Sequence, residues 1–502
     1  MSAGVRQLIE RQASLRPDAL YAMDHEGRQQ LSFGELAGRS RQVAALLLAQ
    51  GTMPGDTVSL VMPNGLATLQ WLLGAMQGGW CVNPVNLLSQ PEQMRYVLEH
   101  SDCKLVIVSP DWEAPVRALL QGMGRSIRLL VSAPDAYDWP AAEADTPAPT
   151  PDTLALLMYT SGTTGRPKGV MLTQANLAAN AAAISTEHAL LPTDRVLAVL
   201  PLYHINAFAV TMLAPLAHGG SLAMPPKFSA ARFWEQACQS GCTWLNVVPT
   251  MISYLLEAGA PTPAQTRGLR FCRSASAALP PEHLRAFEAR FGLSIIETMG
   301  LTETVAPSFS NPLDPGQRKP GAVGRASGCE ARVIDAALAG LPDGQTGELA
   351  IRGPNVMRGY YKNPEATAAA FTPDGWLRTG DLGHRDADGF FFVTGRIKEL
   401  IIKGGENIAP REIDEVLLKH PAVLDAAAVG IPDRHYGQEI MACVMLRPGH
   451  SADEAALHSF CLAQLGRYKT PKLFRLVSDL PRGPSGKVQR LKLVELYAPA
   501  PD

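Results

Sequence analysis

Hydrophobic and polar positions before residue 150 alternate between two kinds of pattern. The pattern predicts amphipathic helices at residues 33–50, 65–78 and 90–100, and short β-strands at residues 57–62 and 105–109. Alternating helices and strands are typical of a layered α/β domain with much parallel sheet. The Pro- and Ala-rich segment 141–152 has no hydrophobic periodicity, and we interpret it as a connector.

A new unit begins after the connector. A buried strand at residues 154–160 runs into the polar run SGTTGRPKG, and an Ala-rich helix is expected from about residue 176 to 189. Further strands and helices continue to about residue 392. From Arg396 the predicted elements are short, among them helices at 411–419 and 452–465. We therefore expect a large domain at residues 1–395 and a small α+β domain at residues 396–502.

Composition narrows the class of protein. The chain has 502 residues, 46% apolar and 18% charged, with a net charge of -2. A chain of this length is longer than one domain with a single hydrophobic core, so at least two domains are expected. Its balanced charge gives no support to a nucleic-acid or membrane-surface role. Its longest nearly uncharged stretch, residues 205–216, is shorter than the ~20 residues that span a bilayer. We expect a cytoplasmic protein whose eight scattered cysteines are reduced, because the first residues lack a signal-peptide pattern.

The loop after the strand at 154–160 has the chemistry of a phosphate site. Residues 160–169 read TSGTTGRPKG, so glycines and hydroxyls are followed by Arg166 and Lys168. Glycine lets the backbone approach an anion closely, hydroxyls donate to it, and the basic residues add positive charge. The spacing departs from the common P-loop, because Pro167 stands where that motif has lysine. The alternative is a flexible surface turn.

The segment YTSGTTGRPKGVMLTQANL resembles the signature of the superfamily of acyl-CoA synthetases, peptide-synthetase adenylation domains and luciferases. Further matching segments follow in order: PLYH at 201–204, MGLTET at 299–304, GELAIRG at 347–353, WLRTGDLG at 376–383, GRIKELIIKGGENIAPREIDEVL at 395–417 and RGPSGKVQR at 482–490. The resemblance covers nearly the whole chain. It implies a large α/β domain with αβαβα-type sheets plus a distorted β-barrel, and a small mobile α+β C-terminal domain.

The resemblance also implies the reaction. A carboxylic acid would be joined to the α-phosphate of ATP with Mg²⁺, pyrophosphate would leave, and the acyl group would pass to the thiol of coenzyme A. A carboxylic acid with a pKa near ~4 is already ionised at neutral pH, so no general base is required. The difficulty is that two anions must meet, so catalysis has to come from positioning, cations and hydrogen-bond donors.

Lys487 resembles the catalytic lysine of the superfamily, which would bridge the carboxylate and the α-phosphate. By itself a lysine in a polar tail is usually solvated surface. His204 resembles the residue near the acyl pocket and the pantetheine channel, although a lone histidine is more often structural. Thr302 and Glu303 resemble the pair that contacts the α-phosphate and holds magnesium, with Glu303 binding the metal together with Thr160 or the ATP phosphates.

The remaining nucleotide contacts are also implied by the resemblance. Asp381 matches the ribose ligand and Arg396 an arginine that reaches the nucleotide, while Met299 stands where the superfamily usually stacks an aromatic ring on adenine. A thioether packs on the base less directionally. The full set expected to bind ATP or coenzyme A is Thr160, Ser161, Gly162, Thr163, Thr164, Lys168, Ser274, Ala275, Met299, Asp381, Arg396, Lys398, Gly404 and Gly405.

The second half-reaction needs a differently shaped site around the acyl carbon, because Lys487 must leave before a thiol can enter. Superfamily members rotate the small domain, and Lys398 resembles the hinge residue, at the kind of element boundary that absorbs dihedral change. After rotation the loop at 403–407, with Gly404 and Gly405, would line the thiol channel. The alternative for the two glycines is a tight strand connection.

The region after PLYH indicates the kind of acid. It reads INAFAV and lacks the aspartate with which peptide-synthetase domains bind an amine, so amino acids are disfavoured. Candidate pocket residues are Asn206, Ala207, Asn246, Val248, Thr250, Ser274, Ala275 and Met299. They suit a short or medium acid with one extra polar group. The run SNPLDPGQRKPGAVG from Ser310 weakly resembles ligases for small dicarboxylates such as oxalate.

Three functions stay open from the sequence. The leading one is an acid–CoA ligase acting on a small-molecule carboxylic acid. The second is a stand-alone ligase that loads the phosphopantetheine arm of an acyl carrier protein. The third is a non-catalytic nucleotide-binding relative or a luciferase-like enzyme, which the joint presence of Lys487, Glu303 and Asp381 disfavours. The sequence indicates no oligomeric state.

Overall fold

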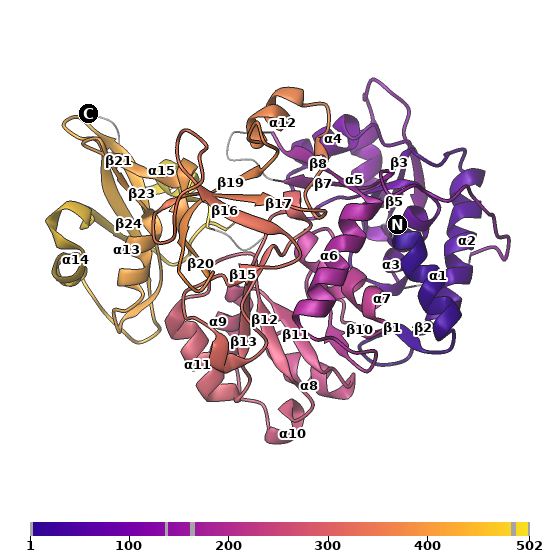
Figure 1. The fold of residues 1–502 in the computed structure, drawn as a ribbon, viewed down its shortest axis with the longest axis horizontal. Coiled ribbons are helices and arrows are strands. Elements are labelled where there is room, and N and C mark those ends of the chain that lie inside the picture. Colours follow the sequence, from indigo (N-terminus) through magenta and orange to yellow (C-terminus); the bar gives the residue numbers. More distant parts are fainter. Residues whose placement is uncertain (1–3, 136–138, 161–165, 483–487, 500–502) are drawn as a thin grey trace.

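The computed structural model describes residues 4–135, 139–160, 166–482 and 488–499 (Figure 1). Its buried hydrophobic clusters fall into two groups along the chain. The clusters of the first group end at Phe391, and those of the second begin at Ile401; we call these two regions the larger part and the smaller part. The domain division expected at 395–396 falls between these two groups and stays a prediction.

One large sheet runs through the larger part and, within the described residues, has nine strands. Its order is β15 (Arg325–Ala326), β14 (Phe309–Ser310), β13 (Ile295–Met299), β12 (Phe271–Ser274), β11 (Trp244–Val247), β9 (Arg195–Leu197), β10 (Ser221–Met224), β1 (Leu20–Asp24) and β2 (Gln30–Ser32). The central neighbours from β13 to β1 are parallel, and both edges are antiparallel. Parallel strands place their carboxyl ends at one edge of the sheet, where ligands usually bind.

A second sheet carries the strand before the glycine-rich loop. In the described residues its order is β18 (Gly359–Tyr360), β8 (Lys168–Thr173), β7 (Leu154–Thr160), β4 (Cys81–Pro84), β3 (Thr57–Val61), β5 (Leu105–Val108) and β6 (Arg128–Val131).

The helices of the larger part are α1 (Val5–Leu15), α2 (Phe33–Ala49), α3 (Leu66–Gln77), α4 (Pro91–His100), α5 (Pro110–Leu120), α6 (Gln174–Glu187), η1 (Ala207–Leu213), α7 (Ala214–His218), α8 (Phe233–Gln239), α9 (Pro249–Glu257), α10 (Pro263–Thr266), α11 (Pro281–Phe291) and α12 (Pro364–Ala370). Short 3₁₀ turns are η2 (Thr302–Thr304), η3 (Pro315–Gln317) and η4 (Ile397–Glu399).

Helix α3 forms the middle layer of the larger part. Every residue of α3 is buried, and the helix contacts both β4 of the second sheet and β1 of the large sheet. A helix that is apolar on all sides belongs in an interior. The αβαβα layering expected from the resemblance is confirmed by this packing and by the solved relatives described below.

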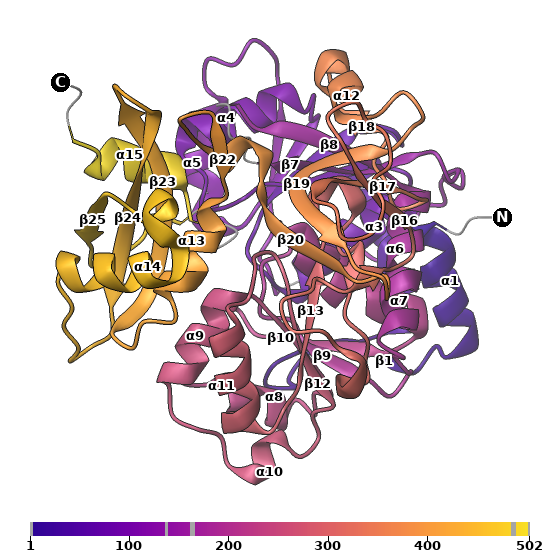
Figure 2. The same cartoon turned by 60° about the vertical axis from the view of Figure 1, so that its left-hand side comes forward.

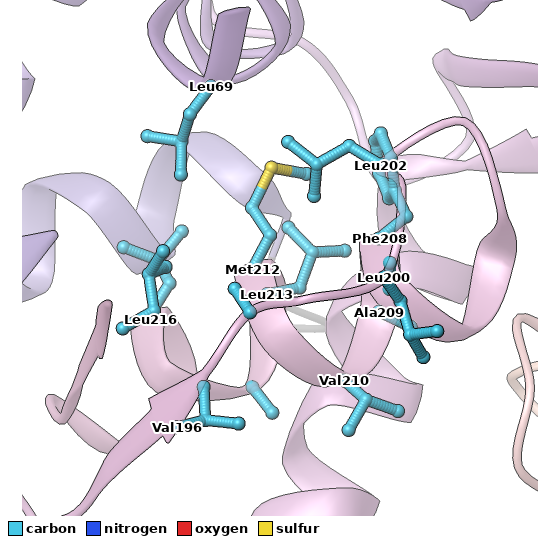
Figure 3. Close-up of a cluster of buried hydrophobic side chains, with 14 of the residues drawn as sticks. Leu69, Val196, Leu200, Leu202, Phe208, Ala209, Val210, Met212, Leu213 and Leu216 are labelled. Atoms are coloured by element: carbon cyan, nitrogen blue, oxygen red, sulfur yellow. The ribbon is translucent and has the colours of Figure 1, made fainter. Parts of the chain in front are cut away.

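The π-helix η1 is also buried along its whole length. Figure 3 shows its side chains, among them Phe208 and Met212, packed with Leu200, Leu202 and with Leu69 of α3. This core fixes the residues that precede η1, which include two of the sequence-predicted site positions, His204 and Asn206. π-helical turns are rare and occur often near functional sites.

A third sheet lies between the rest of the larger part and the smaller part (Figure 1). Its antiparallel strands are β16 (Glu330–Ile334), β17 (Gly347–Arg352), β19 (Leu377–Arg385) and β20 (Phe391–Arg396). In the described residues, the region expected to form a distorted barrel is this four-stranded antiparallel sheet. Its last strand, β20, leads directly into the smaller part.

The smaller part is an α+β unit. Its described elements are β21 (Ile401–Lys403), β22 (Glu406–Ile408), α13 (Pro410–Leu417), β23 (Val423–Asp433), β24 (Gly437–Leu446), α14 (Glu454–Lys469), β25 (Leu473–Leu476) and α15 (Arg490–Tyr497). In both views it lies beside α9 and α11 of the larger part (Figures 1 and 2). Arg411 of α13 donates to the backbone oxygen of Val393 on β20 at 2.7 Å, which joins the two parts.

One sequence prediction about this region is wrong. The chain was expected to pass from the glycine-rich loop directly into a helix at about 176–189, but strand β8 follows the loop and α6 begins at Gln174. Strand β8 pairs with β7 on one side and with β18 on the other, so tertiary pairing decides its conformation. Thr173 then caps the helix by accepting from the backbone nitrogen of Asn176 at 3.2 Å.

The other predicted helices and strands of the first 150 residues are confirmed within one residue at each end. All eight cysteines are unpaired in the structure, and most are buried. Among the residues that the structure describes, no helix is both long enough and apolar enough to cross a membrane.

Candidate active site

The carboxyl ends of the neighbouring strands β12 and β13 form the centre of the candidate site. Ser274 ends β12, and its hydroxyl oxygen is buried without a hydrogen-bond partner among the described residues. Ala275 follows it and is buried. Met299 ends β13 opposite Phe309 of β14, and its side chain packs beside that phenylalanine in a small hydrophobic cluster. The structure therefore brings three of the predicted nucleotide contacts to one sheet edge.

The turn that carries Thr302 and Glu303 has an uncommon backbone. It ends at Val305 with φ of 59° and Ala306 with φ of 35°, and Ser276 after β12 has φ of 75°. Left-handed conformations are costly for residues with a Cβ, above all for β-branched valine, and they concentrate at functional sites. The adjoining loops of β12 and β13 both carry this strain.

Glu303 is held by a residue from a distant part of the chain. Tyr360 of β18 donates its hydroxyl hydrogen to Glu303 Oε1 at 2.8 Å. The Lys168 ammonium, at the start of β8, lies 4.7 Å from the centre of the same ring. Burial, and then the neighbouring Glu303 charge, raises the pKa of Tyr360, so this hydroxyl stays a donor at neutral pH. Tyr360 thus connects the base of the glycine-rich loop to the predicted metal-binding carboxylate.

The glycine-rich loop itself is framed by two strands. Thr160 ends β7 and faces Lys168 of β8 in the antiparallel ladder. Ser161, Gly162, Thr163 and Thr164 lie outside the described residues. The Arg166 guanidinium lies 5.5 Å from the centre of the Tyr96 ring. The two strands that flank the loop in sequence, β7 and β8, are antiparallel neighbours.

Asp381 and Arg396 pair across the third sheet. They face each other in the β19–β20 ladder, and Arg396 Nε donates to Asp381 Oδ1 at 2.6 Å. Burial opposes the charge on Arg396, but the Asp381 carboxylate outweighs it and the pKa of Arg396 is raised. The second oxygen, Oδ2, is buried and has no partner among the described residues. A buried carboxylate oxygen without a donor suits a ligand hydroxyl, as the ribose assignment requires.

On the acid side, predicted pocket residues come together around an arginine. His204 packs its ring edge-on against Tyr203 at 4.8 Å between ring centres. Asn206, directly before Ala207 and η1, accepts from Nη1 of Arg273 at 2.8 Å and from Asn246 at 3.4 Å. Val248 and Thr250 lie farther along, at and beyond the start of α9.

The smaller part places the predicted hinge and channel residues. Lys398 is exposed in η4, two residues after Arg396. Gly404 and Gly405 join β21 to β22 with φ of 55° and 88°, the values of a two-residue hairpin turn that favours glycine. Both glycines are exposed, and their predicted contact with the pantetheine arm stays a prediction. Lys487 lies outside the described residues.

Arg490, three residues after Lys487, is anchored beside the predicted hinge residue Lys398 through Glu399. It donates to Asp414 Oδ2 at 2.5 Å, to the backbone oxygen of Ala428 at 2.6 Å and to Glu399 of η4 at 3.3 Å. Asp414, which pairs with Arg490, is buried. These contacts hold the start of α15 against η4, α13 and β23.

Sequence reasoning missed three residues of this arrangement: Arg273, Tyr360 and Arg490. The signal for Arg273 was present, because an arginine in the run FCRS interrupts an otherwise apolar strand. Tyr360 and Arg490 carried no such signal, since each acts through partners that are far away in sequence.

Models of known protein families match most of the chain. The family described as AMP-binding enzyme matches residues 9–361, and the AMP-binding enzyme C-terminal domain matches residues 412–487. The chain belongs to the AMP-binding enzyme family. Both matches agree with the arrangement of a larger and a smaller part.

Relatives of this AMP-binding enzyme are acid–CoA ligases. It is 59% identical to sulfoacetate–CoA ligase of Cupriavidus necator over 97% of this chain and 96% of that protein. It is 36% identical to oxalate–CoA ligase of Arabidopsis thaliana over 98% of each chain. Among solved structures it is similar to ATP-bound MatB from Rhodopseudomonas palustris, with a TM-score of 0.92 and 33% identity over 98% of this chain and 99% of that one.

The AMP-binding enzyme is thus an acid–CoA ligase that works through an acyl-adenylate intermediate, with ATP, a carboxylic acid and coenzyme A as substrates. This resolves the choice among the three functions left open by the sequence in favour of the first.

Proposed function

We propose that this ligase activates a short acid that bears a second anionic group, with sulfoacetate as the first candidate. The observation that carries this proposal is the 59% identity to a sulfoacetate–CoA ligase along nearly the full length of both chains. The similarity to an oxalate–CoA ligase points to the same chemical class, since both acids are small and doubly anionic. Free coenzyme A, and not an acyl carrier protein, is the proposed acceptor, and the cytoplasm is the proposed location.

In the first half-reaction a carboxylate oxygen of the acid attacks the α-phosphorus of ATP. A phosphorus–oxygen bond forms, the bond to the leaving pyrophosphate breaks, and acyl-AMP remains. We assign Asp381 to the ribose hydroxyls, because its Oδ2 is buried and unpartnered, and Thr302 to the α-phosphate. Lys487 supplies the cation that lets the two anions approach.

Glu303 fits a magnesium site. Magnesium commonly binds to one or two carboxylates and to substrate phosphates, and keeps several waters. Glu303 offers one carboxylate, with one oxygen held by Tyr360, beside the phosphate-binding loop. Among the described residues, no group of three or more His, Cys, Asp or Glu side chains could form a metal cage. When bound, Mg²⁺ would neutralise phosphate charge, while Glu303 and Tyr360 would fix its position.

In the second half-reaction the thiol of coenzyme A attacks the acyl carbon. A carbon–sulfur bond forms, the bond to the AMP oxygen breaks, and AMP leaves. We propose that the smaller part, beginning at residue 396, rotates about Lys398 between the two steps. The exposed turn at Gly404 and Gly405 then lines the thiol channel in place of the Lys487 segment.

The experiment is acid-dependent pyrophosphate release over a carboxylate panel, with thioester formation measured for free coenzyme A and for a phosphopantetheinylated carrier protein. We expect sulfoacetate to give the highest kcat/KM, and saturation by coenzyme A at micromolar concentration. Preference for a monoanionic acid of similar size would contradict the proposed substrate. Thioester formation on the carrier protein alone would contradict the proposed acceptor.

A further inference from the structure

Arg273 is a fully buried cation in the middle of the large sheet. It lies on β12, between Asn246 of β11 and Ile296 of β13 in the strand register, and has 0% of its surface exposed. Arginine is almost never fully buried unless it is paired with an anion. Among the described residues no carboxylate forms an ion pair with Arg273.

The hydrogen bonds of Arg273 use one end of its guanidinium group. Nη1 donates to Asn206 Oδ1 at 2.8 Å and to Asn246 Oδ1 at 2.7 Å. Nε and Nη2 are buried and have no partner in the described part of the chain. Nε–H and one Nη2–H point the same way along one edge of the planar group, the edge that receives two oxygens of a carboxylate or sulfonate in a bidentate contact. The edge suited to an anion is therefore the one left without partners.

The surroundings of Arg273 do not compensate its charge. Burial lowers the pKa of Arg273 to about 9, and burial together with the Arg273 charge lowers the pKa of His188 to about 3. Burial also raises the pKa of the Cys272 thiol, so that neighbour is neutral as well. A buried guanidinium surrounded by neutral groups is costly unless an anion joins it.

The hydrogen-bond partners of Arg273 place it beside the candidate acid pocket. Asn206 and Asn246, which accept from its Nη1, are both predicted pocket residues. Asn206, its partner, lies two residues after His204 and donates to Ser276 Oγ at 3.2 Å, so the network continues into the loop after β12. The network therefore reaches the strand end at which we place the reacting carboxylate.

We propose that Arg273, held by Asn206 and Asn246, binds the second anionic group of the acid and so determines that the enzyme prefers doubly anionic substrates. The inference rests on the proposed function and specifies which side chain selects the substrate. The chemical class of ligand is a carboxylate or sulfonate separated from the reacting carboxylate by no more than a short linker.

The test compares the wild-type enzyme with Arg273→Met and Arg273→Lys on three acids. Sulfoacetate and oxalate carry a second anionic group, whereas 3,3-dimethylbutyrate has the shape of sulfoacetate with a neutral tert-butyl group. We expect Arg273→Met to lower kcat/KM for the doubly anionic acids by about 100-fold or more, mainly through KM. The KM for ATP should stay unchanged, and kcat/KM for 3,3-dimethylbutyrate should stay equal or rise. Arg273→Lys should retain part of the preference, since lysine keeps the charge but loses the planar fork.

Thermal unfolding separates this role from a structural one. Removing an unpaired buried charge should leave the melting temperature of Arg273→Met equal to that of the wild type or higher. The exposed Arg285, changed to methionine, serves as the matched control and should alter none of these quantities. The sulfoacetate and oxalate arms show whether the site favours sulfonate or carboxylate.

Two failures are distinguishable. If the wild-type enzyme forms no thioester from either doubly anionic acid, the proposed function is wrong. If the wild type uses one of them but Arg273→Met, folded and binding ATP normally, loses all three acids equally or keeps its preference, the assignment of Arg273 is overturned.

Discussion

Tyr360 donates its hydroxyl hydrogen to Glu303 at 2.8 Å, while the face of the same ring lies against the Lys168 ammonium. One side chain thus contacts both the carboxylate assigned to magnesium and the base of the phosphate-binding loop. Tyr360 belongs to β18, which pairs with β8 almost two hundred residues earlier in the chain.

Tyr360→Phe should slow the first half-reaction. The ring and its contact with Lys168 stay, but Glu303 loses a hydrogen bond to a charged acceptor, worth about 1.5–3 kcal/mol. We expect acid-dependent pyrophosphate release to fall about tenfold or more, and conversion of supplied acyl-adenylate to thioester to stay unchanged. Tyr361→Phe is the matched control, because the Tyr361 hydroxyl donates to Asp102 instead. Equal loss in both half-reactions would argue against the role given to Tyr360.

Lys487→Ala should separate the two half-reactions more completely. A unit charge ~4 Å from the reacting groups is worth roughly 4 kcal/mol at an effective dielectric of ~20, so pyrophosphate release should fall about a thousandfold. Supplied acyl-adenylate should still give thioester with coenzyme A. The measurement is pyrophosphate release beside single-turnover thioester formation. If a folded variant loses both activities equally, Lys487 does not act in adenylation alone.

Asp381→Asn should weaken nucleotide binding. The substitution removes the charge that pairs with Arg396 and turns the acceptor for the ribose hydroxyls into an amide. We expect the KM for ATP to rise about 10- to 100-fold, with little change in the KM for the acid. Asp386→Asn, which breaks the ion pair with Lys319 near the end of the same hairpin, should leave the KM for ATP unchanged. A matching rise in both variants would show that the hairpin, and not the ribose contact, is affected.

The buried pair of Asp414 and Arg490 should dominate the stability of the smaller part. Asp414→Leu leaves the Arg490 guanidinium buried without its main anion, and we expect a loss of about 3–5 kcal/mol in the free energy of unfolding. Adding Arg490→Met should recover at least half of that loss, since an apolar pair of similar volume replaces the ions. Urea unfolding of the two single variants and the double variant gives the coupling. No recovery in the double variant would mean that the pair does not act as a unit.

Glu297 on β13 should make stability depend on pH. Burial raises the pKa of Glu297 from 4.5 to about 7, with Glu288 and Glu415 acting in the same direction and Arg411 opposing them. Its contribution is present in full below pH 4.5 and is lost as the pH rises through about 7. In the wild type we expect the free energy of unfolding to fall by on the order of 1–2 kcal/mol from Glu297 between about pH 5 and pH 8. Glu297→Gln should not show this fall. An unchanged slope in the variant would refute this assignment.

Much of the fold follows from local patterns. The helix that begins at Phe33 and the strand that begins at Thr57 were predicted because apolar periodicity and turn residues mark their limits. The residues now assigned to the nucleotide were placed by resemblance, and the structure gathers Ser274, Met299 and Glu303 at adjacent strand ends. Their individual roles stay predictions.

What the sequence did not indicate depends on distant pairing. Strand β8 is short, and its conformation follows from β7 and β18 on either side. Arg273 is recognisable as unusual in a strand, but its partners Asn206 and Asn246 come from two other elements, so its hydrogen bonds appear only in the folded chain. Propensity reports on neighbours in sequence, whereas these contacts are set by neighbours in the sheet.

The contacts assigned to the two substrates are distributed unequally among the three sheets of the larger part. The side chains assigned to the acid come from consecutive strands β11 and β12 and the turn before η1, while Lys168, Tyr360 and Asp381 come from two other sheets. Strand β12 carries residues assigned to both substrates, Arg273 to the acid and Ser274 to the nucleotide, so only the contacts from the other two sheets are separate from the choice of acid.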